Sequence, residues 1–270
     1  MDWTRRTLVG GIASATVPLA GCSLDSPSDD PTDSGGGGDF EQVQVDGQTL
    51  VVGLGELSPS TVNVIAPDGT AFASRSVPQG ATTVTFDIGL SYAPGEYRVV
   101  ASTGESTIAE TTLTIAPDLE ILEVGVGANH LDRMPTGLGN TKSAEALVTV
   151  INRGNGPAIL EKILFLGGVP NPTTDLQDAD EEEASGIFIK AEGASEVTQL
   201  VILGNQKDTL YTSRLPFSFH EDGVSCSSDE QTGKFRVVLS TRIEGASATG
   251  EYSISYTRSS ESGECNIRIN

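Results

Sequence analysis

The stretch TVNVIAPDGTAFASRSV, residues 61–77, shows how this chain folds. Two segments rich in β-branched or alternating residues, 61–65 and 72–77, flank Pro67-Asp68-Gly69, which has the composition of a tight turn. A polar and apolar alternation with a period of two is typical of a strand with one buried face, and no helical period fits. The sequence therefore predicts two strands joined by a turn.

The same pattern continues on both sides of this stretch. Short strand-like segments recur at intervals of roughly eight to twelve residues, separated by turn signals such as Asp46-Gly47 and Pro94-Gly95. The strands expected before Pro117 are 42–45, 49–52, 61–65, 72–77, 82–88, 96–101 and 107–115. So many short strands in so short a segment indicate a β-sandwich, which we place at residues 40–117.

The phrase LSYAPGEY, residues 90–97, sharpens this prediction. It resembles the start of a late strand in immunoglobulin-like and fibronectin-type sandwiches. In those domains a tyrosine hydroxyl bonds back to the preceding loop and forms a tyrosine corner. The resemblance implies this role for Tyr97, and a plain half-buried strand tyrosine is the alternative interpretation.

A second run of strands follows Pro117-Asp118. The expected strands are 119–126, 146–152, 159–165, 186–189, 196–203, 209–213, 234–243, 251–257 and 265–269. Within this run, ALVTVINRGNGPAILEKILFLGG, residues 146–168, resembles the strand–turn–strand at the start of many prokaryotic surface immunoglobulin-like modules. We expect residues 118–270 to form a second, larger β-sandwich, with insertions at 173–184 and 210–229.

The two units share a short sequence echo, because Gly95-Glu96-Tyr97 parallels Gly250-Glu251-Tyr252. The echo places a Gly-Glu-Tyr at the start of a late strand in each unit, as two copies of one sandwich class would, and chance similarity is the alternative. The fold class expected is thus all-β, with two tandem immunoglobulin-like β-sandwich domains after a signal peptide and a disordered linker.

The N-terminus carries an export signal. Arg5 and Arg6 precede an uncharged run, 7–20, that is too short for the roughly 20 residues that span a bilayer, and the run closes at Leu19-Ala20-Gly21-Cys22. This order resembles a twin-arginine export signal ending in a lipobox. The resemblance implies that residues 1–21 are a signal peptide and that Cys22 carries a lipid. The alternatives are an ordinary secretory signal with a chance arginine pair and an incidental cysteine.

Residues 22–39 are rich in Ser, Asp, Pro, Thr and Gly. A segment with so few apolar residues cannot bury enough surface to offset the entropy lost on ordering. We expect a lipid-anchored flexible linker with a reach of roughly 20–25 Å, which holds the folded domains clear of the membrane.

The charge balance restricts both partner and setting. The chain has 37 Asp and Glu against 16 Lys and Arg, a net charge of -21, so phosphates are repelled and no nucleic-acid partner is expected. At molar salt the screening length is only about 3 Å, and the self-repulsion largely disappears. This acidic, lysine-poor composition resembles proteins of extreme halophiles, in particular haloarchaeal lipoproteins exported by the twin-arginine route. An acidic mesophilic surface protein is the alternative.

Two cysteines remain once Cys22 is assigned to the lipid. An even remainder in an oxidising compartment predicts a structural disulfide between Cys226 and Cys265, closing a loop of about 40 residues. A thiol pair for metal or redox chemistry is the alternative, although no CxxC spacing supports it.

The sequence contains little that would support catalysis. The histidines are His130 and His220, and no nucleophile elbow, phosphate loop, or zinc or copper spacing is present, so we expect no catalytic residue and no cofactor. The densest anionic cluster is a candidate calcium site, formed by Asp175, Asp178, Asp180, Glu181, Glu182 and Glu183. It lacks the glycine turn and terminal glutamate of an EF-hand loop, and a solvated acidic loop is the alternative.

The sequence thus predicts a location more firmly than an activity. Trp3 lies in the signal, and the candidates for an exposed aromatic contact are Tyr211, Phe217 and Phe219, with core packing as the alternative. We expect a lipid-anchored protein on the extracellular face of the cell membrane, serving as a non-catalytic binding module for another envelope protein or extracellular partner. The alternatives are a structural spacer or accessory subunit of a membrane complex, and a secreted enzyme.

Overall fold

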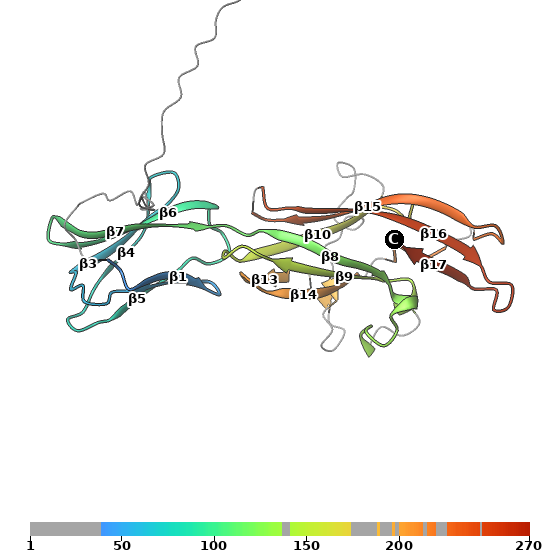
Figure 1. The fold of residues 1–270 in the computed structure, drawn as a ribbon, viewed down its shortest axis with the longest axis horizontal. Helices are drawn as coiled ribbons and strands as arrows, with labels where there is room; N and C mark the ends of the chain where they lie inside the picture. The colour runs from blue at the N-terminus through green and yellow to red at the C-terminus, as the bar shows by residue number, and fades with distance from the viewer. Residues whose placement is uncertain are drawn as a thin grey trace, which may run out of the picture. The chain divides into compact units, whose positions relative to one another are not determined.

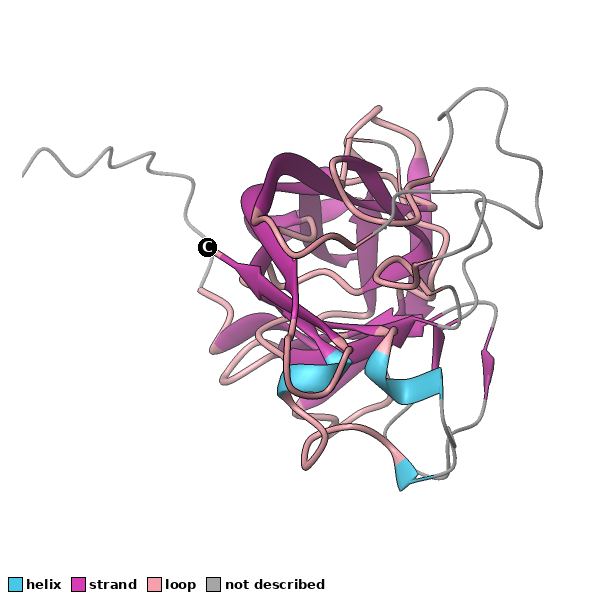
Figure 2. Cartoon of the chain, turned by 90° about the vertical axis from the view of Figure 1, so that its right-hand side faces the viewer, coloured by secondary structure: helices cyan, strands magenta, loops and turns pink. Residues whose placement is uncertain are grey.

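The computed structural model describes most of the chain from residue 39 onward. The described ranges are 39–136, 141–173, 188–189, 196–197, 200–212, 215–219, 226–243 and 245–270. All belong to one compact unit, Gly36–Asn270. They form strands and loops with short 3-10 turns such as η1 (Gly127–Asn129) and η3 (Thr141–Ser143), as Figure 2 shows. The predicted all-β class is confirmed.

The predicted signal peptide and nearly all of the predicted linker lie outside the described residues, so their assignment stays a prediction. No helix in the described ranges is long and apolar enough to cross a membrane.

The first sandwich consists of two antiparallel sheets (Figure 1). One sheet has the order β1-β2-β5, from β1 (Gln42–Asp46), β2 (Thr49–Gly53) and β5 (Thr83–Asp87). The other has the order β4-β3-β6-β7, from β3 (Thr61–Ile65), β4 (Ala71–Ser76), β6 (Gly95–Thr103) and β7 (Ser106–Ile115). Every strand predicted for this region is present, with small shifts at the ends.

The core of the first sandwich follows from strand alternation. In β5 the residues Val84 and Phe86 are buried while their neighbours are exposed. They join Leu50 from the same sheet and Val62 and Val99 from the facing sheet in one apolar cluster. Side chains of alternate residues point to opposite faces of a sheet, so each strand contributes one apolar row and one solvent row.

Tyr97 forms the predicted tyrosine corner. Its hydroxyl donates to the carbonyl of Ala93 at 2.8 Å, and its ring is buried against the edge of Phe72, with ring centroids 5.3 Å apart. The chain enters this strand through Gly95, where φ is +149° and an added Cβ would lie 2.8 Å from a Pro67 side-chain carbon. The phrase that predicted the corner therefore also contains the glycine that makes it possible.

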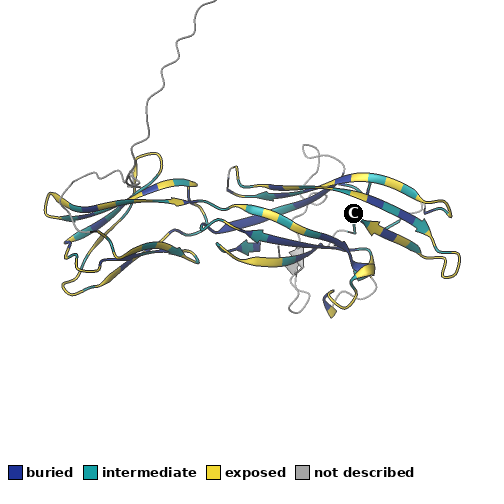
Figure 3. Cartoon of the chain, viewed as in Figure 1, coloured by how far each residue is buried: buried dark blue, intermediate teal, exposed yellow. Residues whose placement is uncertain are grey.

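The second sandwich has the same architecture with more strands (Figure 1). One sheet has the order β12-β11-β14-β9-β8, from β8 (Leu119–Val126), β9 (Ala146–Asn152), β11 (Phe188–Ile189), β12 (Glu196–Val197) and β14 (Lys207–Thr212). The other has the order β13-β10-β15-β16-β17, from β10 (Ala158–Gly167), β13 (Leu200–Ile202), β15 (Gln231–Thr241), β16 (Ala248–Arg258) and β17 (Cys265–Ile269). Figure 3 shows buried and exposed bands alternating along β16 and β17.

One sequence prediction for this region is wrong. The expected strand 196–203 is two short strands in different sheets, β12 and β13. The two Gly-Glu-Tyr stretches both lie at the start of a late strand, but the strands are not equivalent: Tyr97 lies in β6, whereas Tyr252 lies in β16, which occupies the place of β7. The strand orders themselves do correspond, because β8-β9-β14 and β13-β10-β15-β16 match β1-β2-β5 and β4-β3-β6-β7. The additions are β11 and β12 beyond β14, and β17 beyond β16.

Asn152, at the end of β9, ties several backbone segments together. The side chain is fully buried, and its Nδ2 donates to the carbonyls of Gly156 at 2.8 Å and Ile202 at 3.2 Å. Its Oδ1 accepts from the backbone N–H of Asp118 at 3.0 Å and of Gly154 at 3.1 Å. All four hydrogen-bonding positions of the amide are thus used.

The turn that follows Asn152 contacts the first sandwich. The Tyr92 hydroxyl donates to the carbonyl of Pro157 at 2.9 Å in a buried position. Asn155 accepts from the Ala116 N–H at 3.3 Å and donates to the Thr114 carbonyl at 2.7 Å. Gly156 is required here, because an added Cβ would lie 2.2 Å from the Tyr92 hydroxyl.

Cys226 and Cys265 form a disulfide, as predicted, with their Cα atoms 6.1 Å apart and a sequence separation of 39. The bond fixes the segment before β15 to the start of β17. Arg258 strengthens the same junction, because its Nε donates to the Cys226 carbonyl at 3.0 Å.

Candidate functional site

A cluster of cations lies on the outward side of one sheet of the second sandwich. Phe235 in β15 points into the core, so its neighbours Lys234 and Arg236 point outward, because side chains alternate along a strand. The register places Arg236 between Leu166 of β10 and Glu251 of β16. The outward side of β15 is therefore charged where its inward side is aromatic.

Two more cations share this side of the sheet. Lys162 of β10 lies opposite Ser240, and Arg268 of β17 lies opposite Ser255. Ser240 is an even number of residues from Arg236 along β15, and Ser255 is an even number from Glu251 along β16. Such residues share one side of a sheet, so both serines and the cations opposite them lie on the outward side. We call the outward side of β10, β15, β16 and β17 the basic face. Its charged residues are Lys162, Lys234, Arg236, Arg268 and Glu251.

The cations of the basic face have no carboxylate partner within the described ranges. The ion pairs found there are elsewhere: Arg98–Glu110, Arg133–Glu123, Arg153–Glu120 and Arg242–Glu161. In a chain with 37 carboxylates and 16 cations, chance placement would surround each cation with acids. Four unpaired cations against one carboxylate therefore make this face a local exception to the charge of the chain.

A groove with a volume of about 490 Å³ crosses the basic face. The residues that line it include the charged Lys234, Arg236 and Glu251 and the aromatic Phe235 and Tyr252. One of the residues that line the groove is a glycine, Gly167. Gly167 has a φ of +104°, and an added Cβ there would lie 2.8 Å from the Lys234 carbonyl.

The groove is suited to an anion. Lys234 and Arg236 supply positive charges, and Ser253 supplies a hydroxyl beside them. Charge-assisted hydrogen bonds from ammonium or guanidinium groups to carboxylates are the strong ones among surface contacts.

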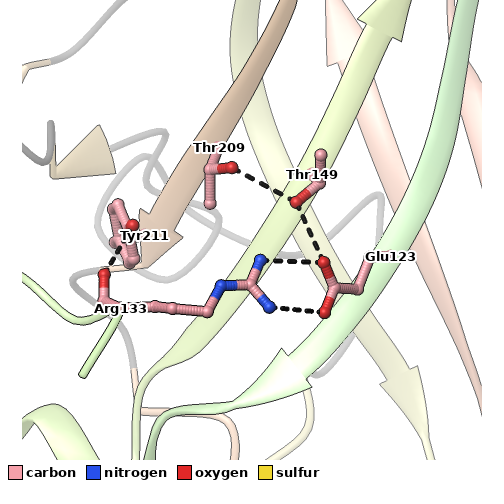
Figure 4. A network of polar contacts seen from close by, with 5 residues as sticks. All are labelled: Glu123, Arg133, Thr149, Thr209 and Tyr211. Carbon is pink, nitrogen blue, oxygen red and sulfur yellow. Dashed lines mark hydrogen bonds and ion pairs between the residues drawn. The ribbon is translucent and has the colours of Figure 1, made fainter. Parts of the chain in front are cut away.

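A second polar cluster lies on the other sheet of the same sandwich (Figure 4). Arg133 forms two parallel bonds to Glu123, with Nη1–Oε1 at 2.7 Å and Nη2–Oε2 at 2.8 Å. Thr149 bridges the Glu123 carboxylate, at 3.4 Å, and the Thr209 hydroxyl, at 3.2 Å. The Tyr211 hydroxyl donates to the Arg133 carbonyl at 2.8 Å.

The electrostatics of this cluster are those of a structural clamp. Hydrogen bonds from Arg133 hold the pKa of Glu123 below its usual range, and the same bonds raise the pKa of Arg133. Below the polar contacts, Met134, Leu147 and Tyr211 form a small apolar cluster. The clamp therefore fastens the loop after β8 to the outer side of the sheet β8-β9-β14.

His130 belongs to the same loop and has a packing role. An added Cβ on Gly125 would lie 2.9 Å from His130 Cδ2, so the ring packs directly on the strand backbone. The neighbouring Asn129 donates to the Ile267 carbonyl at 2.8 Å and links the loop to β17. No group of three or more His, Cys, Asp or Glu residues able to hold a metal occurs within the ranges described above.

Glu145, just before β9, is the buried acid of this region. Its side chain is 2% exposed, and burial raises the pKa of its carboxyl. Oε1 accepts from the Thr141 hydroxyl at 2.8 Å, whereas Oε2 has no hydrogen-bond partner. A half-satisfied buried carboxyl is costly in its charged form, which explains the direction of the shift.

The predicted site residues have different outcomes. Arg5, Arg6, Cys22, His220 and the acidic cluster from Asp175 to Glu183 lie outside the described residues, so the export, lipid and calcium predictions remain untested. Tyr211 and Phe217 are buried and Phe219 packs against the core, as in the alternative interpretation of these aromatics. The basic face was not among the sequence predictions, although the alternation Lys234-Phe235-Arg236 within a strand was its signal.

Comparison with known proteins identifies no family for this chain. No family model and no curated protein matches it. It is similar to a two-domain fibronectin type III segment of chicken tenascin, with 11% identity, a TM-score of 0.27, and coverage of 86% of this chain and 98% of that chain. It is similar to the human OSCAR ligand-binding domain, with 11% identity, a TM-score of 0.24, and coverage of 79% and 97%.

A glycoside hydrolase is also among the similar structures. A β-glucuronidase of glycoside hydrolase family 2 has 11% identity and a TM-score of 0.22, and the match covers 78% of this chain and 18% of that chain. The chain thus spans less than a fifth of that enzyme. Similarity at this level identifies neither an activity nor a ligand.

Proposed function

We propose that this chain is a non-catalytic binding module, held at the outer face of a cell membrane by a lipid on Cys22 and adapted to high salt. Its partner is another envelope protein or an extracellular molecule with an anionic surface. The order of Arg5-Arg6, the apolar run and Leu19–Cys22 supports export and anchoring. The net charge of -21 supports a high-salt setting.

The observation that carries the binding proposal is the basic face. Within the part of the chain that the structure describes, four cations on one sheet form no ion pair, and they are available to a partner. Complementary charge mainly gives specificity and speed of association, which suits a surface-displayed module. The polar clusters around Glu123 and Asn152, in contrast, are used within the fold itself.

Binding is tested by recovering partners from detergent-solubilised membranes. The purified full chain is compared with the double variant K234E/R236E, and with K142E/K207E as the matched control, because Lys142 and Lys207 carry the same charge change away from the face. We expect a partner retained by wild type and control and lost from K234E/R236E. Equal recovery by all three chains would contradict the assignment of the face.

Anchoring is tested with Cys22→Ser. The wild-type chain should sediment with membranes and require detergent for release, while the variant should pass into the medium. A wild-type chain that is soluble without detergent would refute the lipid anchor, whatever the outcome of the binding experiment.

A structural spacer is the second candidate, and the contacts of Tyr92 and Asn155 favour it. They link the two sandwiches through backbone carbonyls and side-chain amides rather than through a bare linker. A spacer needs such a junction but no partner at the basic face. The spacer is favoured if variants that weaken the Tyr92 and Asn155 contacts lose function while K234E/R236E keeps it.

A further inference from the structure

We propose that the basic face binds an extended acidic polypeptide segment lying along β15, with carboxylates on alternate residues above Lys234 and Arg236. This inference rests on the proposed binding function and names the class of partner.

The spacing of the cations supports an extended polypeptide. Lys234 and Arg236 are two residues apart on one strand, a separation of roughly 6.6–6.8 Å at the usual rise of 3.3–3.4 Å. Lys162 lies at the level of Ser240, four residues further on, or roughly 13 Å. An extended segment repeats with the same rise, so acidic side chains at its first, third and seventh residues meet the three cations in turn.

The uncharged residues of the face favour a polypeptide over a polysaccharide. The outward positions of β15 and β16 that the structure describes hold hydroxyl, aliphatic and charged side chains, whereas Phe235, Tyr252 and Tyr256 all pack into the core or against it. Sugar rings are bound best on exposed aromatic rings, whereas the aromatic residues that line this groove, Phe235 and Tyr252, pack against each other with ring centroids 5.4 Å apart. Ser253 at the groove offers a hydroxyl suited to peptide amides.

A membrane is a poorer fit than a polypeptide. Faces that bind bilayers combine cations with exposed apolar anchors. Among the described residues the exposed large apolar side chains are Leu122 and Leu131, and neither belongs to the strands of the basic face. The apolar residues on the side of the cations, Leu164, Leu166 and Val238, are buried or half-buried instead.

Glu251 restricts where the acidic segment can lie. It is directly opposite Arg236 on the neighbouring strand, so a carboxylate placed over β16 would meet repulsion. The favourable positions for carboxylates are therefore confined to the line of β15 and Lys162. Replacing Glu251 by Gln removes the repulsion over β16. Carboxylates could then bind there as well, and any acidic segment should bind more tightly.

The experiment compares two fluorescent peptides of identical composition. One has the order Glu-Ser-Glu-Ser-Ser-Ser-Glu and the other Glu-Glu-Ser-Ser-Ser-Ser-Glu, and binding to the purified full chain is measured by fluorescence anisotropy. The salt concentration is the lowest at which circular dichroism shows the folded protein. Because the second order misplaces one of three partly exposed ion pairs, we expect the first to bind about two- to fivefold more tightly.

Variants and competitors separate the possible failures. K234E/R236E should lose binding of the first peptide, K142E/K207E should retain it, and Glu251→Gln should tighten it. Equal affinity for both peptides, or stronger binding to alginate or to phosphatidylglycerol vesicles, would overturn the extended-polypeptide inference while leaving anion binding intact. No binding to peptides, alginate or vesicles would overturn the proposed function as well.

Discussion

Replacing the buried Asn152 by Ala should destabilise the protein. The substitution removes two donors from the buried carbonyls of Gly156 and Ile202, and one acceptor from the N–H groups of Asp118 and Gly154. A buried polar group left without its partner costs about 1–3 kcal/mol, while the two partly buried N–H groups can turn to water at less cost. We expect a loss of about 2–4 kcal/mol in the free energy of unfolding.

The assay is urea unfolding followed by circular dichroism, with Asn155→Ala as the control. The control makes the same chemical change in the same turn, but the Asn155 amide bonds are exposed or partly exposed, so about 0.5–1.5 kcal/mol is expected. The slope against urea should stay constant, since neither change alters the surface exposed on unfolding. If Asn152→Ala costs no more than Asn155→Ala, the account of Asn152 as a buried clamp is refuted.

Four further perturbations have defined outcomes. Tyr97→Phe removes the hydroxyl that donates to Ala93 and should lower unfolding stability by about 0.5–1.5 kcal/mol, measured by urea unfolding; an unchanged midpoint would count against the tyrosine corner. Reducing the Cys226–Cys265 disulfide should cost about 4 kcal/mol by the chain-entropy relation for a separation of 39 residues, and identical urea midpoints with and without reductant would contradict this. Burial raises the pKa of Glu145, so the stability that this carboxyl contributes is lost as pH rises from the ordinary glutamate pKa through the raised one. Glu145→Gln should reduce this dependence of the unfolding midpoint on pH, measured in thermal unfolding scans. Hydrogen bonds lower the pKa of Glu123, so its contribution is lost as pH falls through the lowered value, and Glu123→Gln should remove that acid-side loss.

The strands of the first sandwich could be predicted because local signals agree with the tertiary fold. Pro67-Asp68-Gly69 and Pro94-Gly95 mark turns through backbone preferences that act within a few residues. The second sandwich was harder where strands are short. Residues 196–203 form a continuous β-like segment in sequence, yet the chain passes from one sheet to the other within it. Which sheet a short strand joins is decided by distant partners, such as Ile159 opposite Val201.

The Gly-Glu-Tyr echo shows a second limit of local sequence. Tyr97 and Tyr252 each follow Gly-Glu at a strand, but only Tyr97 has the preceding loop carbonyl within reach of its hydroxyl. Tyr252 lies beside Phe235 instead, with ring centroids 5.4 Å apart. A tripeptide predicts a strand, whereas the hydrogen bond depends on which loop the fold brings to that strand.

The basic face could not be predicted from composition, because composition reports the average charge and the face is a departure from it. Lys162, Lys234 and Arg268 are far apart in sequence and share a surface only through the registers of β10, β15, β16 and β17. Their carboxylate neighbours are few because the outward residues between them are mostly serine and threonine. At molar salt, long-range repulsion between this acidic chain and an acidic partner is screened beyond about 3 Å, while direct contacts survive. A local cluster of unpaired cations is then sufficient to select an anionic partner, even though the protein as a whole carries a charge of the same sign.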